Sequence, residues 1–121
     1  MDTAGHEHHT LIASDRVSGT DVFDRNGEKI GAVERFFIEK QSGRVVYALM
    51  SFGGFLGIGE AHYPIPWSKL NYDTALGGYR IDITEQDLER APKWEDENSV
   101  ENREWGERVH GHYNVPPYWV P

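Results

Sequence analysis

The sequence predicts an all-β fold, a sandwich or a small barrel, for most of this 121-residue chain. Turn signals recur about every ten residues between short apolar runs. The run at residues 45–50 contains no polar residue, so we expect both faces of that strand to be covered. A longer strand at residues 29–39 has two mixed faces, which is the pattern of a strand that bends at a bulge or glycine in a small barrel.

Local signals predict the shorter elements. Asn26-Gly27 is the strongest hairpin signal, because a type I′ turn needs two residues that tolerate positive φ. Thr84 and Asp87 have the spacing of a capping box that opens a short helix, and Ala91-Pro92 ends it. Further elements are expected as follows: strands at 11–13, 21–24, 61–63, 71–72 and 79–83, a helical turn at 15–17 capped by Ser14, and another at 67–70.

Charge divides the chain into three parts. Residues 11–92 hold 9 basic and 12 acidic side chains, whereas residues 93–121 have the same net charge of −3 in about a third of the length. We therefore expect a mobile, histidine-containing tail at 1–10, one domain at 11–92, and an acidic, aromatic extension at 93–121. The total charge of −8 disfavours nucleic acids and anionic membranes as partners.

The extension is acidic, but it is too aromatic for an ordinary disordered tail. It carries three of the four tryptophans, and its ending is proline-rich and aromatic. We expect a helix from a Ser99 cap through Val109, and residues 115–119 ordered against a barrel, either their own or that of a neighbouring subunit. The alternative is a free peptide ligand that awaits another protein.

Several kinds of site are excluded or weakly supported. The chain has no cysteine, which excludes disulfides and thiolate metal sites, and it has no apolar run near the ~20 residues of a membrane span. A cytoplasmic location without membrane insertion is therefore expected. The glycine-rich stretch at 53–59 lacks the Lys-Ser/Thr pair of a phosphate-binding loop, so no cofactor is expected. His62 could act in catalysis, but nothing around it in the sequence supports an enzyme, and a hydrogen-bonded structural role is the simpler interpretation.

Two groups of histidines could ligate a metal. His6, His8 and His9 are weak candidates for a metal-binding or metal-responsive module, although a flexible tail supplies little rigidity. His110 and His112 flank Gly111 and could form a two-ligand clip. We expect no bound metal.

Residues 11–92 resemble the PRC-barrel domain, the β-barrel of the photosynthetic reaction-centre H subunit's cytoplasmic part and of the C-terminal domain of the ribosome-maturation factor RimM. The resemblance rests on five segments: DVFD at 21–24, NGEKIG at 26–31, SGRVVYA at 42–48, FGGFLGIGE at 52–60 and PIPWS at 64–68. The ending VPPYW looks like that of small stand-alone bacterial members. The resemblance implies a six-stranded barrel that contacts other proteins and has no catalytic residues.

The sequence therefore favours a non-enzymatic interaction or scaffolding module, and the partner is not identified. Three apolar side chains on a glycine-rich loop cannot all turn into so small a barrel, so they should line a contact surface. A homodimer is the first expectation. The expected interaction residues are Phe52, Phe55, Leu56, Ile58, Trp105, Tyr118 and Trp119.

Overall fold

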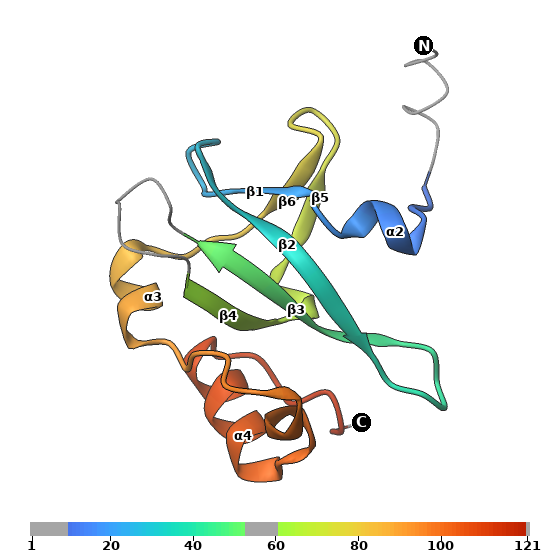
Figure 1. Ribbon diagram of the computed structural model, residues 1–121. Coiled ribbons are helices and arrows are strands. Elements are labelled where there is room, and N and C mark those ends of the chain that lie inside the picture. Colours follow the sequence, from blue (N-terminus) through green and yellow to red (C-terminus); the bar gives the residue numbers. More distant parts are fainter. Residues whose placement is uncertain (1–9, 53–60, 121) are drawn as a thin grey trace.

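The computed structural model describes residues 10–52 and 61–120 and contains one curled β-sheet with a helical C-terminal extension (Figure 1). The strands are β1 (Asp21–Phe23), β2 (Lys29–Ile38), β3 (Val45–Phe52), β4 (Ala61–Pro66), β5 (Asn71–Asp73) and β6 (Gly78–Arg80). The helices are α2 (Ser14–Val17), α3 (Glu85–Arg90) and α4 (Arg103–His112), with 3-10 turns η1 (Trp67–Lys69) and η2 (Glu97–Glu101). The predicted all-β class is confirmed.

The six strands form one sheet in the order β4-β3-β2-β1-β6-β5. β1 and β6 pair in parallel, and the other neighbouring strands pair antiparallel. Within the described residues the hydrogen-bonded order does not close, and β4 and β5 are its two edges. In Figure 1, β5 and β6 cross at a steep angle to β2 and β3, so the sheet curls around its core.

β2 contains the kind of irregularity that its two mixed faces predicted. Its register against β3 shifts between Val33 and Arg35, and again between Phe37 and Ile38. A register shift inserts an extra residue, which changes the side that the following side chains face. The bulge therefore explains why neither face of β2 is uniformly apolar.

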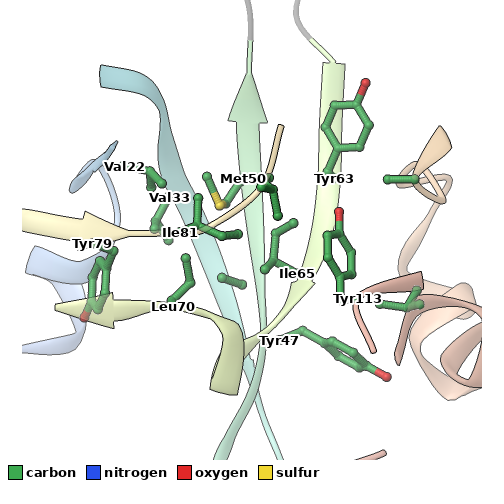
Figure 2. Close-up of a cluster of buried hydrophobic side chains, with 14 of the residues drawn as sticks. Val22, Val33, Tyr47, Met50, Tyr63, Ile65, Leu70, Tyr79, Ile81 and Tyr113 are labelled. Carbon is green, nitrogen blue, oxygen red and sulfur yellow. The ribbon is translucent and has the colours of Figure 1, made fainter. Parts of the chain in front are cut away.

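β3 is covered on both sides, as its apolar run predicted, and five consecutive residues of the strand are buried. Inside the curl of the sheet its side chains join the main apolar cluster, and Tyr63 and Tyr113 lie on the side of the extension (Figure 2). The central side chains of that cluster include Val22, Val33, Met50, Ile65 and Ile81, each fully buried.

The β1–β2 hairpin forms as predicted, but not with a type I′ turn. Gly27 has a positive φ of 83°, whereas Asn26 does not. The carboxylate of Asp24 accepts hydrogen bonds from the backbone N–H groups of Asn26 (2.8 Å) and Glu28 (3.0 Å). These bonds stabilise a turn that is longer than the two-residue type I′ turn. Such a turn needs a positive φ only at Gly27.

The capping box at α3 and the helical turn at η1 are confirmed. Thr84 Oγ1 accepts from the N–H of Asp87 (3.2 Å), and Asp87 Oδ2 accepts from the N–H of Thr84 (2.9 Å). Hydrogen bonding to the backbone of Thr84 holds the pKa of Asp87 below its ordinary value. The strand predicted at residues 79–83 is β6, which is shorter and ends at Arg80.

Three local predictions are wrong, and the first is the Ser14 cap: α2 begins after Ala13, and no side chain caps it. Residues 11–13 form no strand, because the carbonyl of Ala13 accepts the N–H of Arg16 (2.9 Å) and begins α2. The cap of α4 is Asn102 rather than Ser99, since Asn102 Oδ1 accepts from the N–H of Trp105 (3.0 Å). Ser99 lies instead inside η2.

Candidate interaction face

The extension lies on its own sheet, and Tyr47 of β3 is the residue that it covers. Tyr47 is 2% exposed. Its ring contacts Trp105 at 5.5 Å between centroids, His110 at 5.4 Å and Tyr118 at 5.7 Å. The contacts with Trp105 and Tyr118 are edge-to-face, and such aromatic contacts add to the stability that burial gives. One aromatic side chain of the sheet therefore joins helix α4 to the chain that follows it.

Trp119 is seated against α4 at a glycine. A Cβ on Gly106 would lie 2.9 Å from the Trp119 ring and 3.2 Å from the Tyr47 hydroxyl, so a side chain here would displace the tryptophan. The guanidinium of Arg103 lies 4.4 Å from the centroid of the same ring, a cation–π distance. Gly106 weakens the helix interior but allows this close approach.

His110 is the buried polar residue of this cluster, and it is 3% exposed. Its Nε2 is hydrogen-bonded to the Tyr47 hydroxyl at 3.1 Å, while Nδ1 is buried without a hydrogen-bond partner among the described residues. Its ring also contacts Trp119 at 5.7 Å. Burial lowers the pKa of His110 and raises that of Tyr47, so both groups are held neutral.

Two adjacent hollows lie where the β2–β3 hairpin, η1 and the end of the extension meet. The larger, of ≈ 610 Å³, is lined by Arg44, Val45, Val46, Pro66, Trp67, Ser68, His110, Pro116, Pro117, Tyr118 and Val120. The smaller, of ≈ 250 Å³, is lined by Ile12, Ser14, Val17, Phe36, Ile38, Val45 and Trp67. Val45 and Trp67 line both hollows, so the two form one continuous surface. We call the six residues Ile12, Ile38, Val45, Trp67, Tyr118 and Val120 the apolar face.

Three branched aliphatic side chains of the apolar face are widely exposed. Ile38 and Val120 are each 50% exposed, and Ile12 is 43% exposed. Single exposed apolar residues are ordinary, but a group of them around shared hollows is typical of an interaction site. The apolar face draws its residues from both ends of the described chain and from the hairpin between them.

The interaction residues expected from the sequence do not lie together on one surface in the described part of the chain. Phe55, Leu56 and Ile58 lie outside the described residues. Phe52 (7% exposed) and Trp105 (3% exposed) belong to the core and do not present a free surface in this structure. Tyr118 and Trp119 are half-buried in the aromatic cluster, and Tyr118 also lines the larger hollow.

The histidines are not gathered at one place in the described part of the chain. His6, His8 and His9 lie outside it. His62 Nε2 lies 3.1 Å from Glu34 Oε2, which joins β4 to β2 across β3. The proposed clip does not form, because His110 bonds Tyr47 and His112 Nε2 bonds the carbonyl oxygen of Asp87 at 2.7 Å. Residues 10–52 and 61–120 contain no group of three or more potential metal ligands.

Sequence reasoning missed most of the apolar face. Ile38 and Val45 were interpreted as strand interior, and Ile12 as part of a strand. A signal was available: Ile38 and Val45 flank the polar turn at residues 39–44, and side chains beside a hairpin turn lie at the end of a sheet. The role of His110 could not be recognised, because its partner Tyr47 is 63 positions away in the chain.

A curled sheet with a bulged central hairpin and an apolar end face defines a small β-domain. The sequence profile of the PRC-barrel domain matches residues 9–88, and the chain belongs to this family. A search of curated proteins finds no match to the chain. In the portion of the chain described by the structure, no helix has the length and apolar character needed to cross a membrane.

Proposed function

We propose that this chain is a non-enzymatic interaction module that binds another protein through its apolar face. The observation that carries the proposal is the exposure of Ile12, Ile38 and Val120 around two joined hollows. Burying one such side chain against a partner stabilises a complex by about 1.5–3 kcal/mol before ordering costs are subtracted. Membership of the PRC-barrel family is consistent with this role.

The arrangement of titratable side chains supports the same proposal. His62 and Glu34 are both about one-third exposed and bridge two strands at the surface. His110 is packed between aromatic rings, with its Nε2 engaged by Tyr47. His62, Glu34 and His110 each interact with a neighbouring side chain of the fold. A catalytic acid, base or nucleophile would need a further reactive side chain beside it.

Affinity capture from the native source tests the proposal. The full chain is immobilised alongside two variants, Ile38→Lys on the apolar face and Tyr72→Lys as a matched control. Both side chains are 50% exposed, and Tyr72 lines neither hollow. We expect Ile38→Lys to lose specific partners that the wild-type chain and Tyr72→Lys retain. Equal capture by all three proteins would contradict the proposal.

A further inference from the structure

The larger hollow lies where β4 would have continued if it were longer. The ladder between β3 and β4 ends at the pair Tyr47 and Pro66. Pro66 has no backbone N–H, and the chain then turns away into η1. Val45 and Val46 belong to β3 but extend beyond this last pair, and both line the hollow. Within the described residues, the floor of the hollow is therefore a short edge of β3 that has no neighbouring strand on the β4 side.

The walls of the hollow suit the side chains of an extended peptide. Trp67 and Ser68 of η1 form one part of the lining, and Pro116, Pro117 and Tyr118 of the extension form another. Its volume of ≈ 610 Å³ is in the range of about 300–1,000 Å³ that binding pockets have. A peptide that adds to a strand edge gains main-chain hydrogen bonds, and pockets for its alternate side chains give selectivity.

The charge in the hollow favours a carboxylate. Among the described lining residues Arg44 is the one permanently charged group, and it is exposed. The Glu39 carboxylate in the same turn accepts the Ser42 hydroxyl (2.5 Å), and Arg44 makes no ion pair within residues 10–52 and 61–120. A peptide that continues in the direction of β4 runs antiparallel to β3, so its carboxyl end points toward Arg44.

We propose that the larger hollow binds an extended, apolar protein segment that pairs with the edge of β3 at Val45 and Val46 and places a carboxylate near its carboxyl end at Arg44. This inference rests on the proposed function, and it names the chemistry of the partner. The segment takes the place of a longer β4, and its alternate side chains lie against Trp67 and Tyr118.

Synthetic peptides test this proposal directly. The probes are fluorescein-labelled hexapeptides of alternating valine and threonine, with either a free or an amidated carboxyl end, titrated into the full-length protein. We expect the free acid to bind about fivefold more tightly than the amide, because a partly exposed ion pair contributes up to ~1 kcal/mol. Arg44→Gln should remove this difference, whereas Arg25→Gln, an exposed arginine outside the hollow that pairs with Asp82 (3.0 Å), should keep it.

A second variant fills the hollow without removing a buried side chain. Ser68 lines it and is exposed, so Ser68→Trp should weaken both peptides about tenfold while leaving the unfolding midpoint unchanged. Because consecutive amides of a strand point to opposite edges, slower hydrogen exchange at one of the two amides of Val45 and Val46 should accompany peptide binding.

Three results would overturn the inference: no binding of either peptide, binding that Ser68→Trp leaves unchanged, or self-association of the protein that Ser68→Trp abolishes. The last would assign the hollow to a second copy of the chain. Ile38 lines the smaller hollow only. If the peptides do not bind but Ile38→Lys still loses protein partners, the peptide-binding inference fails and the proposed function stands.

Discussion

Gly106 shows how one residue can be unfavourable locally and necessary for packing. Glycine in a helix interior costs about 1 kcal/mol relative to alanine. Here a Cβ would approach the Trp119 ring to 2.9 Å. The same ring also contacts Arg103 and His110, which hold it in place. The packing of the extension therefore decides the residue at this position, and helix propensity does not.

We predict that Gly106→Ala destabilises the protein despite the better helix propensity of alanine. The control is Gly111→Ala in the same helix, where a Cβ meets nothing within 4 Å and should give a gain of up to about 1 kcal/mol. Urea unfolding measures both changes, and tryptophan emission should shift to the red in Gly106→Ala alone. Equal stabilisation by the two substitutions would show that Trp119 does not occupy this position.

His110 makes the stability of the cluster depend on pH. Burial lowers its pKa in the folded protein, so the unfolded chain binds the proton more readily. The stability that its neutral form contributes is therefore complete above the ordinary histidine pKa of about 6.5 and is lost as the pH falls below it. The side chains around it are Tyr47, Tyr118 and Trp119, and none of them carries a negative charge that would offset the cost of burying a protonated ring; the backbone of Pro116 opposes the pKa shift only in part.

We expect the unfolding free energy of the wild-type protein to fall between pH 7 and pH 5 more steeply than that of His110→Phe. The phenylalanine variant keeps the ring contacts and removes the titrating group. Urea unfolding at a series of pH values gives the two curves, and the difference between them isolates His110 from the other titrating groups. Parallel curves would rule out the buried, neutral histidine.

At the scale of the element, the extension acts as a cover for β3 and not as an independent helix. α4 is only ten residues long, and isolated helices of that length are marginal in water. Its stability comes from Trp105 and Val109, which are buried in the main cluster, and from the hydrogen bond of His112 to the carbonyl oxygen of Asp87 in α3.

Deleting residues 93–121 should therefore destabilise the domain by a few kcal/mol, because it exposes Tyr47 and removes the aromatic residues that pack on it. Blue-shifted tryptophan emission should be lost as well. Deleting residues 1–10 is the control, and it should change the melting temperature by less than ~4 °C. A silent truncation after Pro92 would contradict the packing of the extension.

Local chemistry predicted some elements well and others poorly. The apolar run of β3, the bulge of β2 and the capping box at Thr84 depend on neighbouring residues, and they are as predicted. The start of α4 was misplaced because Ser99 and Asn102 are both good caps, and tertiary packing of Trp105 selects the second. Residues 11–13 are a short apolar run, but no neighbouring strand pairs with them in the described sheet.

At the scale of the whole molecule, the sequence predicted an aromatic extension that packs on a β-domain but not the surface that the two form together. The apolar face combines Ile12 before the first strand, Ile38 and Val45 at a hairpin, and Val120 near the end. No local pattern joins residues so far apart in the chain. The assembled face exists because the extension returns to the end of β3 where β4 stops.

We propose that the barrel and its extension present one contact face. Hydrogen–deuterium exchange of the full-length chain, alone and with a captured partner, tests it most directly. We expect exchange to slow together at residues 36–46 and 115–120, two of the stretches that border the hollows. Protection confined to β5 and β6, with both of these stretches unchanged, would contradict the claim.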